Sequence, residues 1–423
     1  MLEKIYHNQC VKSYVGYTLI QARRLIGRQA SQILLLVLLA LTLDVQAQGT
    51  GTRGTGFFPY ALAGLSYDSN LLRQSDDEIL NLTDQKSDWY VTAEAGVNGK
   101  LDISRQRFLI DGRIFHNAYD HFDDLDHTGG HGRLAWKWAW QPYWSGDIGY
   151  IYDRRLRDLS NQVVAIPERE LRTEHRGFVS ISRALGAGLS VNAGYSLADI
   201  DYEENSLLEL EREVATAGFE YATTLNNTIG IEAEFVDGSF KSDSNRDYEE
   251  FRGRVVLDWR LSGRNALDAY IGYTERDNDN PQRTDFDGIT GRVGLVRKGA
   301  FDRDQLSATL WRDVSTFSDE VANYAVVYGA SLEPQWGIGR ASTIRLLAQY
   351  ERRDYKGTKF GLDPDLELGS RDDDIYTAGV YYDWRIAALV TLSFGYTGEI
   401  RDSDRDTAEY DYNLFEFRVR VGE

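Results

Sequence analysis

The feature that most constrains this chain is a two-residue alternation of apolar and charged side chains. In "FRGRVVLDWRL", apolar residues and glycine occupy every second position from Phe251 to Leu261, and charged residues fill most of the positions between. The pattern recurs up to "LFEFRVRV", which ends at Val421. A period of two is the period of a β-strand. Because the charged faces hold more Arg and Glu than a dry core accommodates, we predict strands with one apolar face and one wet face.

The apolar faces need a cover, and both a soluble core and lipid could provide it. After residue 47 no run of apolar residues approaches the ~18–20 that a membrane helix requires. A chain that crosses lipid without such helices must form a closed barrel, because every backbone N–H and C=O needs a partner there. The mean hydropathy of −0.44 is compatible with a barrel, since only alternate residues face lipid.

The links between the predicted strands alternate in length. Short links such as "QPYW" at Gln141 alternate with long acidic links such as "SNLLRQSDDEILNLTDQKSD" after Asp68. A soluble sandwich has no reason to sort its loops in this way. We therefore predict an all-β fold, namely a transmembrane antiparallel up-and-down outer-membrane β-barrel of about 18 strands, with short periplasmic turns and long acidic extracellular loops.

Tryptophans gather near the short links. We interpret them as an aromatic girdle at one membrane interface, because a soluble core would not collect its indole rings at one end of the strands. The predicted girdle residues are Trp136, Trp138, Trp140, Trp144, Trp259 and Trp384, and Trp336 is expected inside a short turn.

The N-terminal region reads as an export signal. Arginines at 23, 24 and 28 precede the apolar run "ILLLVLLALTL", and small residues follow it up to Ala47. We predict a signal peptide over 1–47, a short periplasmic segment over 48–56 and the barrel over 57–423, with cleavage near Ala47 and an integral outer-membrane location. An uncleaved anchor, or a true start downstream of Met1, would also explain the long leader. The single cysteine, Cys10, precedes the apolar run, so no disulfide is expected in the exported chain.

Charge restricts the partners. The formal net charge of −19 argues against nucleic acid as a partner, since such proteins carry basic stripes. Outer-membrane lipid is the expected surrounding, and the oligomeric state stays open. The alternation predicts a lumen lined by charged and aromatic groups that could tune a pore or merely hydrate it. The lumen candidates are Arg113, Lys137, Asp147, Glu232, Glu234, Arg252, Arg254, Asp258, Arg260, Arg292, Trp311, Arg345, Glu416, Arg418 and Arg420.

Motifs for metal binding and catalysis are weak. "HNAYDHFDDLDHTGGHG" contains His116, His121, His127 and His131 among aspartates, but much of it is a predicted exposed loop, and we predict no metal site. Elsewhere in the exported chain the only histidine is His175, which the alternation places on the opposite face from Ser180 and Ser182. We therefore predict no catalytic residues, no cofactor and no enzyme activity.

A resemblance adds a functional hypothesis. "SRQR" at Ser104, "YDHFDDLDHTG" at Tyr119, "WSGDIGY" at Trp144 and "PYALAGLSYDSNLLR" over 59–73 resemble the EpsL-type outer-membrane proteins, which are encoded with exopolysaccharide biosynthesis operons and belong to the broader β-barrel porin families. The resemblance covers residues 59–150 and is only architectural beyond them. It implies a barrel that assists export of a secreted polysaccharide together with other export-machinery proteins.

The functional prediction from sequence is thus an outer-membrane channel or export component for exopolysaccharide. The alternatives are a general diffusion porin for small solutes and, in different classes, a barrel-borne hydrolase or a surface adhesion protein.

Overall fold

The computed structural model describes residues 55–75, 85–161, 168–225, 227–301, 303–315, 322, 324–359, 367–368 and 370–422. The predicted signal peptide, its cleavage point and most of the 48–56 segment lie outside the described residues, as does Glu423.

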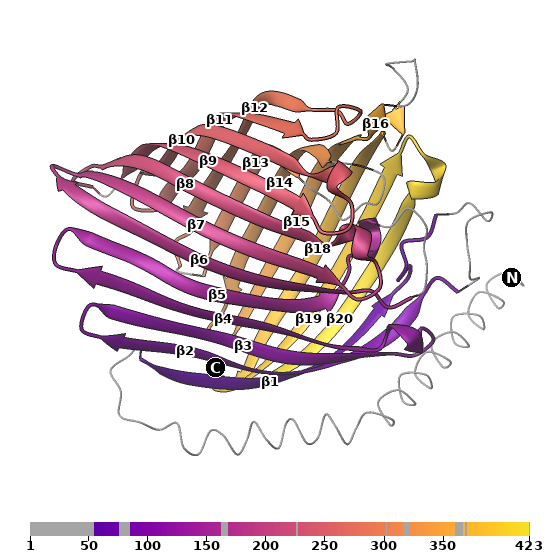
Figure 1. Cartoon of the computed structure of the whole chain (residues 1–423). Coiled ribbons are helices and arrows are strands. Elements are labelled where there is room, and N and C mark those ends of the chain that lie inside the picture. Colours follow the sequence, from indigo (N-terminus) through magenta and orange to yellow (C-terminus); the bar gives the residue numbers. More distant parts are fainter. Residues whose placement is uncertain are drawn as a thin grey trace, which may run out of the picture.

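Eighteen strands form one antiparallel sheet that closes on itself (Figure 1). Each strand pairs with its neighbours in the sequence, and β1 pairs with both β2 and β20, which closes the ring. The predicted fold class, an outer-membrane-type β-barrel of about 18 antiparallel strands, is therefore confirmed. Its strands are β1 (Gly56–Asp68), β2 (Asp88–Ile103), β3 (Gln106–Tyr119), β4 (His127–Trp140), β5 (Trp144–Leu156), β6 (Leu171–Gly186), β7 (Leu189–Tyr202), β8 (Leu210–Ala222), β9 (Thr228–Phe240), β10 (Tyr248–Arg260), β11 (Asn265–Asn278), β12 (Phe286–Lys298), β13 (Gln305–Ser315), β14 (Tyr324–Ile338), β15 (Ser342–Lys356), β18 (Arg371–Ala387), β19 (Val390–Ser403) and β20 (Tyr410–Gly422).

The remaining elements are short. β16 (Thr358–Lys359) and β17 (Glu367–Leu368) pair with each other in the link between β15 and β18. The other elements are 3₁₀ turns, η1 (Asp123–Leu125), η2 (Leu159–Asn161), η3 (Ser206–Leu208), η4 (Ser244–Arg246) and η5 (Asp406–Ala408). In the described part of the chain no helix is long and apolar enough to cross a membrane.

The two ends of the barrel carry different connections. Tight turns at 104–105, 141–143 and 187–188 lie at one end, on the left in Figure 1, where Ser104, Gln141 and Ala187 take a positive φ. The 3₁₀ turns and the longest links, at 69–87, 157–170 and 357–370, lie at the other end. We call these the short-turn end and the long-loop end. Trp336 does not lie in a turn as predicted, because β14 keeps its alternation through Ile338 and the turn begins after that residue.

Contacts between strands that are not neighbours identify the inner face of the wall. The Tyr270 hydroxyl on β11 donates to Asp313 Oδ2 on β13 at 2.9 Å, across β12. Arg252 on β10 also reaches Asp313, at 3.8 Å. Side chains can skip a strand in this way only across the concave side of a closed sheet. The alternating positions of these residues therefore face the lumen, and the intervening positions face outward.

The outward face is apolar between two aromatic borders. Trp140, Trp144 and Trp384 border it at the short-turn end. Toward the long-loop end, outward tyrosines donate to outward carboxylates, as in Tyr195 to Glu213 at 2.6 Å and Tyr273 to Asp287 at 2.8 Å. Aromatic rings with a polar tip suit a membrane interface. Large exposed apolar side chains such as Leu310 fill the band between the borders.

Four hairpins at the long-loop end share one loop geometry, which the sequence interpretation missed. In the loops of η1, η3, η4 and η5, the last residue of the loop is acidic and its amide donates to the carbonyl of the residue three positions earlier. The residue just before the acid is Leu125, Leu208 or Arg246 in the first three loops, and it is buried in each. Asp126 and Asp247 also accept a hydrogen bond from the last amide of the preceding strand, at 2.7 and 2.6 Å. In the loops of η1, η3 and η4 this geometry therefore accompanies burial of the side chain that precedes the acid.

Candidate functional site: the lumen

The strand registers determine where each predicted lumen residue lies. Every residue of the predicted lumen set occupies the alternating position that faces the inner side of the wall. Several of them form neighbouring pairs of opposite charge. Lys137 lies 3.5 Å from Asp147, and Arg254 contacts Glu232 and Glu234, each at 2.7 Å. Within the described part, no ion pair includes Asp258, Arg260 or Arg292.

Aromatic rings accompany the arginines on this wall. The Arg345 guanidinium lies 4.5 Å from the Tyr381 ring centroid and 3.9 Å from Glu333. Arg420 lies 4.0 Å from the Tyr60 ring centroid, and Arg418 pairs with Glu416. A guanidinium held between a carboxylate and a ring is neutralised and oriented. The wall therefore presents both signs of charge side by side rather than a field of one sign.

Water reaches the lumen side chains toward the short-turn end. The side chains of Arg113, Lys137 and Arg345 are each 47% exposed although they point inward. An inward-facing charged group can stay this exposed only if the space in front of it is open to solvent. This part of the lumen is therefore hydrated.

The lumen wall toward the long-loop end is packed instead. On β18 and β19, Asp373 bridges Arg371 and Arg401, and the three side chains are 0%, 4% and 2% exposed. On β10 and β11, Glu250 and Arg276 are similarly buried. Charges this deeply buried require partners, because desolvation costs several kcal/mol for each unpaired ion. The inner wall is thus open to solvent at Arg113, Lys137 and Arg345, whereas other residues fill the space over these ion groups toward the long-loop end.

One part of this filling is an apolar cluster built by three loops, which we call the mouth cluster. It consists of Leu71, Leu72, Tyr119, Phe122 and Leu125, with Leu159 packed against it. These residues come from the links after β1, β3 and β5, together with the end of β3. The link after β5 also reaches the β19 wall, where Arg401 Nη1 donates to the Ser160 carbonyl at 2.6 Å. The loops therefore extend into the opening of the barrel.

A second part of the filling is the hairpin of β13 and β14. The pairing of β12 with β13 stops at Gly291–Arg312, whereas β12 continues along β11 to Phe286 and β13 continues along β14 to Ser315. Beyond that point Val314, Tyr324 and Val326 pack on Phe286, an inward residue of β12. The Arg276 guanidinium on β11 lies 5.2 Å from the Tyr324 ring centroid. The hairpin tip has therefore left the wall and folded onto its inner surface.

Trp311 has a role in this hairpin. Its indole lies over Gly329, where a Cβ would collide with the ring, and it packs against Ala325, Val327 and Tyr355. The sequence predicted Trp311 as a lumen aromatic but did not reveal that its ring packs on residues of β14 and β15.

The side chains of the histidine-rich segment lie apart and do not form one site. Imidazoles of His116 and His131 lie on opposite faces of the wall, bonded to Thr128 at 3.0 Å and Asp153 at 3.2 Å. The His127 ring contacts the Leu125 carbonyl at 2.9 Å. His175 faces outward against the Tyr150 hydroxyl, on the opposite face from Ser180.

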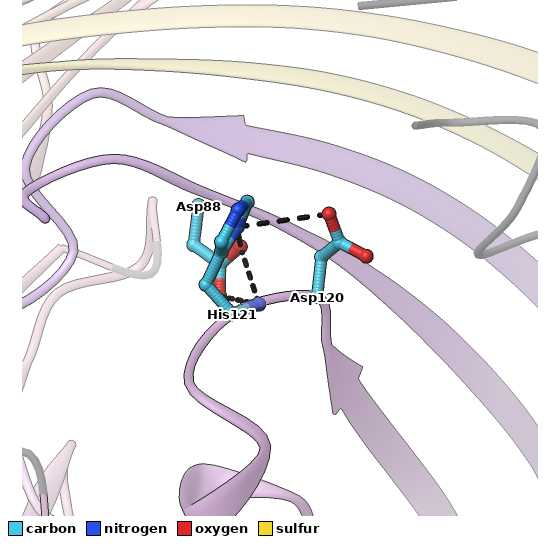
Figure 2. Close-up of side chains that lie close together, drawn as sticks. All are labelled: Asp88, Asp120 and His121. Carbon is cyan, nitrogen blue, oxygen red and sulfur yellow. Dashed lines mark hydrogen bonds and ion pairs between the residues drawn. The ribbon is translucent and has the colours of Figure 1, made fainter. Parts of the chain in front are cut away.

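Among the described residues, His121 belongs to the one group of a histidine and two carboxylates whose ligand atoms all lie within 4.8 Å of one another, together with Asp88 and Asp120 (Figure 2). Its Nδ1 lies 3.1 Å from Asp88 Oδ1 and 3.6 Å from Asp120 Oδ2. Such spacing could suit a cation, but the buried Asp88 already accepts hydrogen bonds from the amides of His121 and Phe122 at 3.0–3.1 Å. We interpret the group as the anchor that ties the β3–β4 loop to β2.

Hydrogen bonds and burial shift the pKa values of two residues in the loops at the long-loop end. Burial disfavours the charged form of Lys241, but hydrogen bonds to the carboxylates of Asp199 and Asp201 outweigh it and raise the pKa of Lys241 to about 12. Burial raises the pKa of Asp247, while the hydrogen bond from the Phe240 amide opposes that shift.

The closed 18-strand wall, its outward apolar band and its ionic interior define the class of protein, a β-barrel of the outer-membrane porin type. No family model and no curated protein matches the chain, so the resemblance to EpsL-type proteins is not supported. Solved structures that are similar include a BenF-like porin from Pseudomonas fluorescens Pf-5, with 11% identity, a TM-score of 0.47 and coverage of 86% of this chain and 98% of that one.

Two Pseudomonas aeruginosa structures are similar to the same degree. OccK2 (OpdF) in complex with glucuronate has 12% identity, a TM-score of 0.48 and coverage of 86% of this chain and 98% of that one. OprD has 12% identity, a TM-score of 0.44 and coverage of 89% and 97%. At this distance the likeness concerns the barrel and gives no information on a solute.

Proposed function

We propose that the protein is a passive outer-membrane channel for small polar solutes, with its long-loop end outside the cell. The observation that carries this proposal is a contrast along the lumen: the inward side chains of Arg113, Lys137 and Arg345 are half exposed, whereas those of Asp373 and Arg401, nearer the long-loop end, are buried. A hydrated passage behind a narrow mouth admits small molecules and sorts them by size. The mixed charges favour neutral or zwitterionic solutes over ions of one sign, because Lys137, Arg254 and Arg345 each have a carboxylate beside them.

Export of an exopolysaccharide, which the resemblance implied, is the less favoured function. An extended glycan needs an open path along the whole barrel, and 18 strands alone would provide one. Here the mouth cluster and the β13–β14 hairpin occupy part of the path. Diffusion of small solutes makes no such demand, so it fits the packed mouth better.

Swelling of liposomes that contain the purified barrel tests this function. We expect uptake of monosaccharides, weaker uptake of disaccharides and almost none of longer oligosaccharides, because the narrow mouth limits size. Equal uptake of all sizes, or single-channel current blocked only by long glycans, would favour export instead.

A substitution in the mouth cluster tests the assignment of the constriction. Leu125→Gln places an amide where the side chain is 0% exposed, and an unsatisfied buried amide costs about 1–3 kcal/mol. We therefore expect the loops to loosen, with higher single-channel conductance and uptake of larger sugars, while the strand wall stays intact.

Leu207→Gln is the matched control, since Leu207 lies in the equivalent loop of η3 but is 50% exposed. It should leave conductance and the size limit unchanged. Unchanged conductance in both variants would mean that these loops do not restrict the passage.

A further inference from the structure

The outward wall contains a shallow groove that extends from β8 to β12. Its volume is about 760 Å³. A row of small residues forms its floor, in which Ala217 pairs with Ala233 and Ala233 pairs with Gly253. Larger apolar side chains border the row, among them Ile231, Val255 and Ile271. The groove lies within the apolar band, where hydrocarbon is the surrounding medium.

A row of carboxylates lies above the groove on the same outward face, toward the long-loop end. Glu213 is opposite Asp237, Asp237 is opposite Glu249, and Glu249 is opposite Asp277. Like charges directly opposite each other on a sheet destabilise it. Within the described part no ion pair includes any of these four carboxylates, and the nearby Lys241 pairs with Asp199 and Asp201. The described part of the chain therefore leaves this row without a positive counter-charge.

We infer that the groove binds an acyl chain of a membrane lipid whose headgroup carries a protonated amine. Gly253 lies four residue steps from Glu249, about 13 Å along a strand, so one lipid can place its chain on the small residues and its amine at the carboxylates. Charge complementarity selects this occupant. A second copy docking here would bring two acidic rows together, and an anionic lipid would face the same repulsion.

The lipid contributes to the barrel in two ways. Its chain fills a surface that the small residues leave hollow, which restores packing contacts. Its amine neutralises a row of like charges that the described residues leave unbalanced. This role does not depend on transport, so it stands apart from the proposed channel function.

Native mass spectrometry of the full barrel in mild detergent tests this inference. The probes are phosphatidylethanolamine and phosphatidylglycerol with identical acyl chains. We expect phosphatidylethanolamine to be retained preferentially. Gly253→Leu fills the groove, and a Cβ there would meet only the Phe251 ring, at 3.8 Å, so the strand itself tolerates the change. We expect about tenfold less retained lipid in this variant, with unchanged channel conductance.

Two controls separate the contributions. Gly177→Leu adds the same side chain to the outward face of β6, where a Cβ would meet nothing within 4 Å, and should retain lipid as the wild type does. The double variant Asp237→Asn and Glu249→Gln should lose the preference for phosphatidylethanolamine. Undiminished retention in Gly253→Leu, preferential retention of phosphatidylglycerol, or an oligomer that dissociates only in Gly253→Leu would overturn the inference, the last by identifying a second copy as the occupant.

Discussion

Asp373→Asn is expected to destabilise the barrel by about 3–5 kcal/mol, because it removes the charge that balances Arg371 and Arg401 in a buried site. The carboxylate also accepts a hydrogen bond from the Ser403 hydroxyl at 2.7 Å. Unfolding by guanidinium in detergent micelles, followed by tryptophan fluorescence, measures the change. Because Arg401 also holds the Ser160 carbonyl, the same variant should widen the mouth and raise the conductance of the fraction that folds.

Asp383→Asn provides the comparison on the same strand and the same face. Asp383 is exposed and accepts from the Ser393 hydroxyl at 2.5 Å, so its loss should change stability by only about 0–1 kcal/mol. If the two variants unfold alike, the buried ion group does not contribute as described.

Leu310→Arg is expected to impair assembly, because it places a charge on the outward face in the apolar band. Leu310 is among the most exposed apolar side chains of the wall, and arginine at such a depth costs about 2–4 kcal/mol. The measurement is the fraction of heat-modifiable barrel on gels after refolding into lipid vesicles.

Thr309→Arg moves the same charge by one residue, onto the lumen side. Since successive residues of a strand face opposite ways, this variant should assemble normally. Normal assembly of both variants would contradict the assignment of β13's faces.

The alternation of the sequence was sufficient to predict the barrel and a strand number of about 18. A closed sheet obeys one local rule, a period of two, and each strand of this chain follows it from turn to turn. Arg371, Asp373 and Arg401 follow it as well, so the buried ion group could have been added to the predicted lumen set. The alternation does not reveal that these residues are buried.

Burial in the mouth depends on contacts between segments distant in the sequence. Ser160 meets Arg401, and Leu72 meets Leu125, through loops whose paths no local pattern specifies. The sequence does not reveal the inward fold of the β13–β14 hairpin for the same reason. The apolar residues that pack on Phe286 occupy the alternating positions that would face lipid in an ordinary strand. This packing is the reason why we propose a channel for small solutes and not the polysaccharide export that the sequence suggested.

The shared loop of η1, η3 and η4 has a consequence for how such a mouth can be altered. Its hydrogen bonds come from the backbone and from the closing acid, whereas the inserted side chain is leucine in two loops and arginine in the third. The loop thus keeps the same length and backbone geometry with different buried side chains at this position. We therefore expect point substitutions at positions 125, 208 and 246 to change the size limit of the mouth without changing the strands of the barrel.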